Sequence, residues 1–594
     1  MLTVAIDEGI NSTVVVTDNG KAVFALQEER ISRSKNFMGF PHQALSFAFD
    51  YLNIKPDDID CVCFSNIYSP LDTKESFLAW YDATADADPR SVIEGDLKNL
   101  TRRLYNRLPL GVVKLRNMMA NSNPNQVMLD HLAVYGLSGK KIKRSHHHLN
   151  HAAAVYFGLR KNPEEPHLVL TLDGGGDHVC SHVYIAERGQ LRLIASTPNG
   201  HSVGNIYSRV THFMGLTPHE HEYKLMGLAA YAKEDYSEKA FQVFKSYLDL
   251  DPTNPLVFRC KIPEMTTGVQ TRLDKDFKRI RFDNIAGGLQ RFTEDLLLRW
   301  VKAAVEQTGI RKVLVSGGVF MNVKANALIS NLDEVEFFDV FPSCGDESLP
   351  FGAAWLHHAE SSPANGDDIE FSGCYLGPEA DYDFAAAKER FASQLHYYKL
   401  NDANKVVARL LARGDIVARC SGKMEFGARA LGNRSILADA DDYHVIPEIN
   451  KMIKNRDFWM PFAPAILLEE VEKYIVVPRT LPPDRISPHM MITFNSKVGK
   501  EQSVAAIHPY DRTARAQIVA RHINPEFHDL MYKFHALTGK GLILNTSFNL
   551  HGFPIVMGSI DAMDVMVNSA LEYLVIGDHL ISKRPLDNLE LLKD

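Results

Sequence analysis

Residues 167–197 read HLVLTLDGGGDHVCSHVYIAERGQLRLIAST, and this stretch decides the predicted fold. An apolar strand runs into the small-residue loop GGGD, and two further strand-like segments return from it. The chain opens in the same order, with LTVAID (2–7), a loop, STVVVT (12–17), the turn Asp18-Asn19-Gly20 and KAVFALQ (21–27). The repeated pattern predicts a duplicated α/β unit, and glycine-bearing loops that face one another could hold a phosphorylated ligand.

Two later apolar runs also end in loops of small or polar residues. KVLVSGGVFMN (312–322) places Gly317 and Gly318 at a strand end, and SCGDES (343–348) places Asp346 just before a predicted helix. Ligands of α/β sheets lie at the carboxyl ends of strands, so both loops are candidate site segments. Each loop taken alone could equally be a tight turn.

The segment HAESSPANGDDIEFS, residues 358–372, is polar and rich in Ser, Gly and Asp, which is typical of a linker. It predicts two domains, residues 1–357 and 373–594. The net charge of -8 without a basic run disfavours a nucleic-acid partner. No apolar run reaches membrane-spanning length, and the first residues do not have the pattern of a signal peptide. Seven cysteines without a C-x-x-C pair indicate neither a disulfide framework nor a zinc ribbon, so a cytoplasmic location is expected.

Four histidines crowd into SHHHLNHAAAVYF, residues 145–157, where the alanines favour a helix. His147 and His151 are one turn apart, so a helix places both rings on one face, where they can bind a single ion. The loop carboxylates Asp173 and Asp346 are the best candidates for further ligands. Nitrogen and carboxylate ligands without thiolate suit iron(II), zinc or manganese better than copper(I). The alternative is a structural histidine pair, which is the commoner case for a pair considered alone.

Basic residues in the second half of the chain stand among Gly, Ala and Phe instead of in a charged run. Guanidinium groups bind oxyanions in bidentate fashion, so this setting favours a recessed phosphate site over surface solvation, the alternative interpretation. Asn545, Thr546 and Ser547 follow the apolar run GLIL and add amide and hydroxyl donors at a strand end. The basic residues of this predicted site are Arg429, Arg434, Lys454, Arg456 and Arg515.

Taken together, the motifs resemble the carbamoyltransferase family of nodulation and cephamycin biosynthesis, over nearly the whole chain. The segments that carry the resemblance are QEERISRSKNFMGFP, HHHLNH, LDGGGD, HEYKLMGLAAY, SGGVFMNVKAN, CGDES, MEFGARALGNRSI, DRTARAQ and LNTSFN. The resemblance implies a duplicated actin-like (ASKHA) metal-binding domain followed by a YrdC-like α/β domain. It also implies that the second domain forms carbamoyl adenylate from carbamoyl phosphate and ATP with Mg²⁺. The first domain would then transfer the carbamoyl group to a hydroxyl or amine of a small-molecule natural product, with Fe²⁺ polarising the carbonyl.

The resemblance also implies roles for individual residues. The implied metal ligands are His147, His151, Asp173 and Asp346. The implied catalytic residues of the carbamoyl phosphate and ATP chemistry are Arg429, Arg434, Lys454, Arg515 and Ser547. The implied cofactor-binding residues are Lys35, Gly317, Gly318, Asn322, Arg456, Asn545 and Thr546. A homodimer is compatible with the sequence, and neither a nucleic acid nor a membrane is an expected partner.

The sequence departs from the family pattern at two positions. Ile10 stands where the family has a histidine that resembles a general base for the acceptor hydroxyl. Isoleucine cannot accept a proton, so either another residue deprotonates the acceptor or the acceptor needs little activation. Met460 stands where many members carry an arginine, which removes one phosphate contact that Arg456 could replace.

Two other functions compete with carbamoyl transfer. The duplicated hairpins also fit an actin-like ATPase or sugar kinase, which would produce ADP and leave the second half of the chain unexplained. Ile10 also fits a non-catalytic or altered homologue that binds ATP and metal as a partner without turning over an acceptor.

Overall fold

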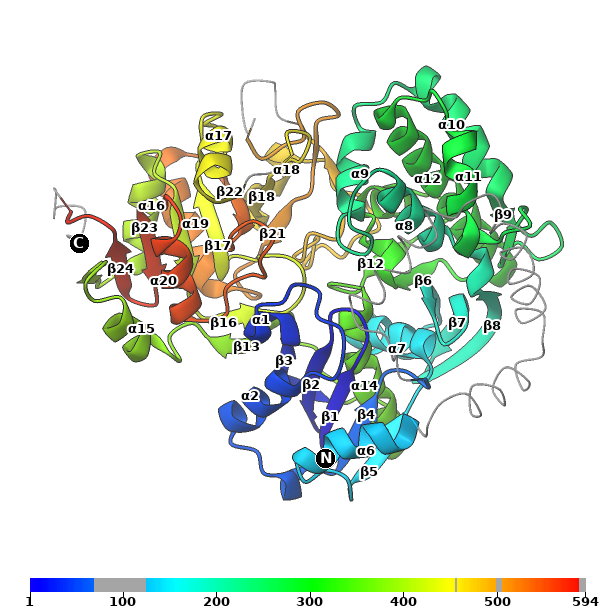
Figure 1. Cartoon of the computed structure of the whole chain (residues 1–594), viewed down its shortest axis with the longest axis horizontal. Helices are drawn as coiled ribbons and strands as arrows, with labels where there is room; N and C mark the ends of the chain where they lie inside the picture. The colour runs from blue at the N-terminus through cyan, green and yellow to red at the C-terminus, as the bar shows by residue number, and fades with distance from the viewer. Residues whose placement is uncertain (69–123, 455–456, 498–504, 587–594) are drawn as a thin grey trace. The chain divides into compact units, whose positions relative to one another are not determined.

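The computed structural model describes residues 1–68, 124–454, 457–497 and 505–586 (Figure 1). Arg456, a predicted site residue, lies outside these ranges. The described chain forms two compact units, each assembled from three segments. The first unit comprises Met1–Lys21, Asn36–Ala325 and Asp339–Glu370, and the second comprises Ala22–Lys35, Asn326–Phe338 and Phe371–Asp594. The last boundary falls inside the predicted linker, whereas nothing in the sequence indicated the two earlier segments of the second unit.

Two five-stranded sheets repeat one topology, in the orders β3-β2-β1-β4-β5 and β12-β11-β6-β7-β8. The first strand of each repeat, β1 or β6, pairs antiparallel with the next strand and parallel with β4 or β11. This confirms the predicted duplication of the strand and hairpin pattern. The strands of the first sheet are β1 (Leu2–Asp7), β2 (Thr13–Asp18), β3 (Lys21–Gln27), β4 (Cys61–Phe64) and β5 (Lys141–Arg144). Those of the second are β6 (His167–Gly176), β7 (Val179–Glu187), β8 (Gln190–Pro198), β11 (Lys312–Ser316) and β12 (Phe337–Val340).

Two apolar helices, α7 (His147–Leu159) and α14 (Leu349–Ser361), pack directly on each other in the first unit (Figure 1). Helix α7 also contacts β6 and β11, and α14 contacts β1 and β4, so the pair joins the two repeats. The helices approach closely at Gly352, where an added Cβ would lie 1.9 Å from the Asn150 carbonyl oxygen. Helix α14 continues to Ser361, four residues into the predicted linker. The apolar run FGAAWLHH therefore extends as a buried helix instead of ending at the polar segment.

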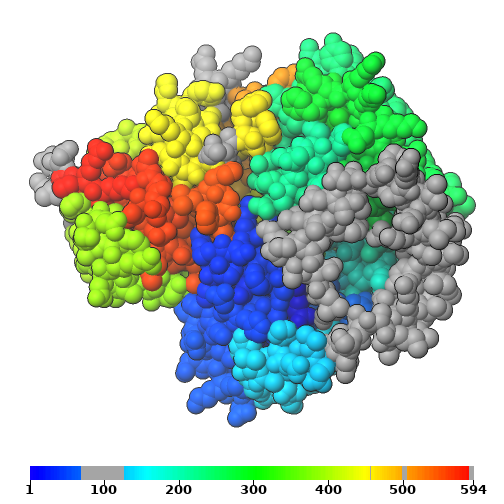
Figure 2. Space-filling view, in the orientation of Figure 1, coloured from blue at the N-terminus to red at the C-terminus, as the bar shows by residue number. Residues whose placement is uncertain are grey.

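A layer of helices completes the first unit and appears in green at the surface in Figure 2. Its longest member, α12, packs against α9 and α10. The helices of this layer are α8 (Val203–Phe213), α9 (Glu222–Ala229), α10 (Glu234–Tyr247), α11 (Gln270–Asp276) and α12 (Phe282–Thr308). The unit also contains α2 (His42–Leu52), α6 (Pro124–Val134), β9 (Leu248–Leu250) and β10 (Phe258–Cys260). Among the described residues, no helix has both the length and the apolar composition needed to cross a membrane.

The second unit is built on an eight-stranded sheet in the order β14-β24-β23-β15-β17-β22-β18-β21. Its strands are β14 (His396–Lys399), β15 (Val417–Cys420), β17 (Arg434–Ala438), β18 (Ala463–Leu467), β21 (Gln517–Val519), β22 (Leu542–Ser547), β23 (Tyr573–Ile576) and β24 (His579–Ser582). Two-stranded ribbons are formed by β13 (Tyr375–Glu379) with β16 (Lys423–Glu425) and by β19 (Phe494–Asn495) with β20 (Thr513–Ala514). The helices that accompany these strands are α15 (Phe384–Arg390), α16 (Ala403–Ala412), α17 (Val445–Ile449), α18 (Val471–Tyr474), α19 (Pro525–Thr538) and α20 (Ser559–Val567).

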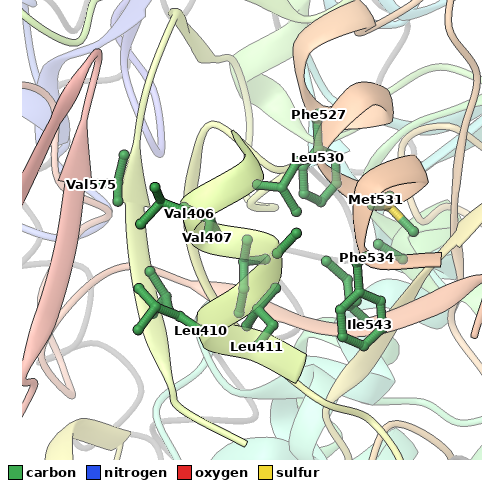
Figure 3. Close-up of a cluster of buried hydrophobic side chains, with 14 of the residues drawn as sticks. Val406, Val407, Leu410, Leu411, Phe527, Leu530, Met531, Phe534, Ile543 and Val575 are labelled. Atoms are coloured by element: carbon green, nitrogen blue, oxygen red, sulfur yellow. The ribbon is translucent and has the colours of Figure 1, made fainter. Parts of the chain in front are cut away.

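Helices α16 and α19 share the main apolar core of this unit, as Figure 3 shows. Apolar residues recur three or four positions apart along each helix, which places them on one face. The core residues on α19 are Phe527, Leu530, Met531 and Phe534. The ends of α19 are also well defined, because Asn524 Oδ1 accepts the Phe527 N–H and Gly539 adopts a left-handed φ of 74°.

Truncation of this core should destabilise the second unit. Phe534 is fully buried between α16 and α19, so Phe534→Ala should lower the free energy of unfolding by about 3–5 kcal/mol. The matched control is Tyr532→Ala on the same helix, because Tyr532 is 59% exposed. Urea unfolding curves of the two variants measure the difference. Equal midpoints for both variants would contradict this assignment of the core.

The segment Ala22–Lys35 joins the second unit through α1 (Glu28–Ser32). Arg30 donates to the Gly427 carbonyl over 2.6 Å, and Arg33 donates to the Pro554 and Ile555 carbonyls, each over 2.9 Å. The conspicuous motif QEERISR therefore anchors two loops of the second unit.

Candidate metal and oxyanion sites

Four side chains converge at the carboxyl ends of strands in the first unit. Their ligating atoms all lie within 4.8 Å of one another, so the residues His147, His151, Asp173 and Asp346 could hold a metal ion. Asp173 lies near the end of β6, Asp346 begins the turn before α14, and the two histidines share one face of α7. The structure therefore brings together the four residues that were predicted from the sequence as metal ligands.

The distances within this cluster suit a small divalent ion. His151 Nε2 lies 3.2 Å from Asp173 Oδ2 and 3.7 Å from Asp346 Oδ1. His147 Nε2 lies 3.8 Å and 3.6 Å from the same two oxygens. Ligands bonded to one ion at roughly 2.0–2.2 Å are separated by distances of this size.

Both histidine Nε2 atoms are buried and make no hydrogen bond, although carboxylate oxygens lie nearby. A buried polar atom without a partner costs free energy, and a bound cation would remove that cost. The carboxylates are only partly buried, with 18% and 25% of the Asp173 and Asp346 side chains exposed, so the cluster has an open side. The donor set therefore fits a divalent metal with a free coordination position.

The charges of the cluster reinforce one another. Burial alone would lower the pKa of His147, but the carboxylates of Asp346 and Asp173 outweigh burial and raise this pKa to about 9. Burial alone would raise the pKa of Asp173, whereas the adjacent His147 and His151 rings hold it well below its usual range. The two carboxylates therefore give the cluster a negative charge that attracts protons and would attract a cation.

Backbone amides orient the Asp173 carboxylate. Its Oδ1 accepts the Gly174 N–H over 2.7 Å, and its Oδ2 accepts the Gly318 N–H over 3.1 Å. Gly317 has a φ of 109°, and an added Cβ there would lie 2.3 Å from the Leu172 carbonyl oxygen. The predicted cofactor-binding residue Gly317 thus packs against the segment that carries Asp173, and only glycine permits that approach.

Asn322, predicted to bind the cofactor, makes contacts within the first unit. Its Nδ2 donates to Gln290 Oε1 over 3.0 Å, and its Oδ1 accepts from Gln290 Nε2 over 2.9 Å. The same Oδ1 accepts the Ala325 N–H at the start of α13 (Val323–Ser330). These bonds fix the turn after Gly317 and Gly318.

The other two histidines of the motif have different surroundings. His148 is fully buried, with Nδ1 2.9 Å from Thr171 Oγ1 and Nε2 3.0 Å from the Val179 carbonyl oxygen, so both ring nitrogens are occupied. His146 precedes α7 and accepts the His148 N–H. His148 therefore links α7 to β6 and β7, and His146 caps the start of α7, so neither belongs to the four-residue cluster.

Two polar residues near the cluster, Asp7 and Asn66, were not predicted from the sequence. Asn66 Nδ2 donates to Asp7 Oδ1 over 2.8 Å, and Asn66 Oδ1 lies 2.9 Å from His147 Nδ1. Burial, with a smaller contribution from the Asp346 carboxylate, raises the pKa of Asp7 to about 7. The only signal in the sequence was their position, because Asp7 ends β1 and Asn66 follows β4.

A second polar cluster lies in the second unit, around a buried lysine. Lys454 Nζ donates to Ser547 Oγ over 3.0 Å and to Asn549 Oδ1 over 2.6 Å, and Ser547 Oγ donates to Asn549 Oδ1 over 2.7 Å. The structure thus brings together Lys454 and Ser547, as the sequence predicted, and adds Asn549, two residues further on. A buried ammonium beside a hydroxyl group suits an oxyanion.

Arg434 lies near this cluster on β17, but its guanidinium is fully engaged by the protein. It donates to the backbone carbonyls of Pro378, Ser421, Gly422, Asn433 and Met557. With the side chain fully buried, these bonds give Arg434 a role in joining loops of the second unit.

The loop before Arg434 is held by a buried carboxylate. Glu425 Oε1 accepts the backbone N–H groups of Leu431, Asn433 and Arg434 over 2.7, 3.1 and 3.0 Å. Arg429 lies on this loop and is partly exposed. Glu425 therefore fixes the backbone that presents Arg429.

The remaining predicted residues occupy varied positions. Asn545 Nδ2 donates to Gln517 Oε1 and to the Ala430 carbonyl, and Thr546 is buried in β22. Arg515 is partly exposed just before β21, and Lys35 ends the first segment of the second unit. Asn545 thus ties β22 to the loop that carries Arg429.

The two departures from the family pattern also have defined surroundings. Ile10 forms an isolated bridge with Met38, and the neighbouring Asn11 has a left-handed φ of 63°. The Met460 N–H donates to the Asp457 carbonyl over 3.0 Å. Neither Ile10 nor Met460 brings an ionisable side chain to its position.

Comparison with known proteins identifies the class of this chain. The carbamoyltransferase N-terminus model matches residues 9–355, and the carbamoyltransferase C-terminus model matches residues 408–583. The chain therefore belongs to the carbamoyltransferase family, and it is an enzyme that transfers carbamoyl groups.

Individual relatives are similar over different lengths. An uncharacterised protein of Synechocystis is 28% identical over 96% of this chain and 95% of its own length. Nodulation protein NolNO of Sinorhizobium fredii is 28% identical over 97% of this chain and 79% of its own length. The 3'-hydroxymethylcephem-O-carbamoyltransferase of Streptomyces clavuligerus is 29% identical over 44% of this chain and 47% of its own length.

Proposed function

We propose that this enzyme uses carbamoyl phosphate and ATP to form carbamoyl adenylate and then transfers the carbamoyl group to a small-molecule acceptor. The observation that carries the proposal is the convergence of His147, His151, Asp173 and Asp346 at the strand ends of the first unit. The family match over both halves of the chain supports it. In this proposal the first half is an actin-like transfer domain and the second half is a YrdC-like adenylate-forming domain.

The first step belongs to the second unit. Carbamoyl phosphate, ATP and one water give carbamoyl adenylate, pyrophosphate and phosphate, and all of these species except water are anions that positively charged side chains can bind. Lys454 supplies a buried ammonium beside Ser547 and Asn549, and Arg429 and Arg515 supply partly exposed guanidinium groups. ATP would bind together with Mg²⁺, and the phosphates of ATP, not these basic residues, would be ligands of that ion.

The second step belongs to the first unit. The acceptor R–OH attacks the carbamoyl carbon, the bond to the AMP phosphate oxygen breaks, and the products are R–O–CO–NH₂, AMP and a proton. His147, His151, Asp173 and Asp346 would hold a divalent ion, with Fe²⁺ the favoured metal, and this ion would supply Lewis-acid polarisation of the carbonyl. The N–H groups of Gly174 and Gly318 keep the Asp173 carboxylate in its ligating orientation.

A hydroxyl group is the favoured acceptor, and an amine is the alternative. The cephem O-carbamoyltransferase relative supports the hydroxyl class by its name, although it matches less than half of this chain. Ile10 cannot accept the proton of the acceptor hydroxyl. Either another residue removes this proton, or the acceptor needs little activation.

Pyrophosphate release tests the adenylate step. The protein incubated with carbamoyl phosphate, ATP and Mg²⁺ should release pyrophosphate. Ser547→Ala should slow that release on the order of 100-fold, because the hydroxyl group that accepts from Lys454 and positions its ammonium is lost. Ser569→Ala, two residues beyond α20 in the same unit, is the control and should retain the wild-type rate. Formation of ADP in place of pyrophosphate would instead indicate an actin-like ATPase or sugar kinase.

A further inference from the structure

The loop that follows β4 contacts His147 at Nδ1, whereas Nε2 of the same ring faces the carboxylates of the metal cluster. Asn66 joins the Asp7 carboxylate, at the end of β1, to the His147 ring, at the start of α7, through contacts of 2.8 and 2.9 Å. One amide side chain therefore links three separate elements of the first unit.

The chemistry of Asp7 fixes which way the Asn66 amide points. Asp7 accepts from Ser65 Oγ over 2.6 Å, from Asn66 Nδ2 over 2.8 Å and from the Gly9 N–H over 2.9 Å. These three donors favour the ionised form of Asp7, which only accepts, so Asn66 turns its NH₂ group to Asp7 and its oxygen to His147. An amide oxygen can only accept, so Nδ1 of His147 carries a proton, and Nε2 is the nitrogen that gives up its proton to bind a cation.

The backbone of this loop is also tied to the helix that carries His147. Asp177 accepts the N–H groups of His147, Ile67 and Tyr68 over 2.8, 3.1 and 3.2 Å. Because one carboxylate holds both segments, Asn66 cannot move away from His147 without breaking these bonds. The bonds to Asp177 therefore hold the backbone beside Asn66 close to the start of α7, which keeps Asn66 within reach of His147.

We infer that Asn66, held by Asp7, is a positioning residue that keeps His147 in the tautomer able to bind a cation through Nε2. The inference rests on the metal site of the proposed function. His151 has no equivalent support, because its Nδ1 lies 3.3 Å from Ser316 Oγ, and a hydroxyl can donate or accept. The relay through Asn66 therefore sets the tautomer at one ligand specifically.

Cobalt titration of the metal-free full chain tests this role. Co²⁺ is the probe, and its visible absorption reports both affinity and coordination geometry. Asn66→Leu keeps the branching of the side chain but removes both amide contacts, and it should weaken Co²⁺ binding about 10- to 100-fold. Asn254→Leu is the matched control, because it makes the same exchange at an exposed position of the first unit outside the relay and the cluster, and it should bind Co²⁺ as the wild type does.

A charge-preserving exchange separates positioning from packing. In Asp7→Asn with Asn66→Asp, the new carboxylate accepts from His147 Nδ1 and from the new amide, so most of the wild-type affinity should return. Wild-type affinity in Asn66→Leu, or an exchange variant no tighter than Asn66→Leu, would overturn the inference. Should Asn66→Leu fail to fold, as judged by its melting curve, the exchange variant decides. If the wild-type protein bound no Co²⁺, the proposed metal site itself would be wrong.

Discussion

Replacing His151 with alanine should abolish tight metal binding and slow carbamoyl transfer by about 100-fold or more, while pyrophosphate release continues. His151 is fully buried and contributes one of the two unpartnered Nε2 atoms of the cluster. Lewis-acid stabilisation is worth several kcal/mol, and each ~1.4 kcal/mol changes a rate tenfold. Metal content after dialysis and the rate of product formation with a competent acceptor measure the two effects.

The control for this variant is a histidine of the same unit outside the cluster. His358→Gln alters α14 where the ring contacts Asp368 Oδ2 at 2.9 Å, so metal content and transfer rate should both remain near wild type. If His151→Ala retained its metal and its transfer rate, the four-residue cluster would not be the site of carbamoyl transfer.

Replacing Glu425 with alanine should unfold the loop that carries Arg429. The substitution leaves three N–H groups in a buried setting without their acceptor, at Leu431, Asn433 and Arg434. Each such group costs about 1–3 kcal/mol, so the second unit should lose about 3 kcal/mol or more of stability. Hydrogen exchange of a peptide covering 426–436 should become much faster, and the urea midpoint of this unit should fall.

Glu425→Gln provides the matched comparison. Its amide oxygen still accepts the three N–H groups, so protection of the loop should largely survive, with a loss of about 1 kcal/mol. Pyrophosphate release should follow the order wild type, Glu425→Gln, Glu425→Ala, because the loop presents Arg429. Equal exchange rates in the two variants would show that the carboxylate does not organise the loop.

The sequence predicted what depends on local pattern. Alternating apolar strands and the turn Asp18-Asn19-Gly20 indicated the duplicated hairpins, which the sheet orders confirm. The four-residue spacing of His147 and His151 indicated a shared helix face, and α7 places both rings beside Asp173 and Asp346. Such features can be predicted because helix and strand periodicity directly determine which side chains share a face.

What the sequence could not predict depends on partners distant along the chain. The segments 22–35 and 326–338 precede the predicted linker but belong to the second unit. Asn66 acquires its role only because β4, α7 and β1 meet at one place. Arg434 was predicted from its residue type, yet five backbone carbonyls engage its guanidinium. Residue type indicates what a side chain can bind, whereas only the tertiary structure shows what surrounds it.

The most direct test of the proposed chemistry is to quench the wild-type reaction without acceptor and measure labelled carbamoyl adenylate. With ¹⁴C-labelled carbamoyl phosphate, ATP and Mg²⁺, the label should appear in an adenylate, with an equal amount of pyrophosphate. The adenylate should also form in His151→Ala, whose substitution lies in the first unit, and should be nearly absent in Ser547→Ala. Label that remains in carbamoyl phosphate while ATP is converted to ADP would contradict the proposal.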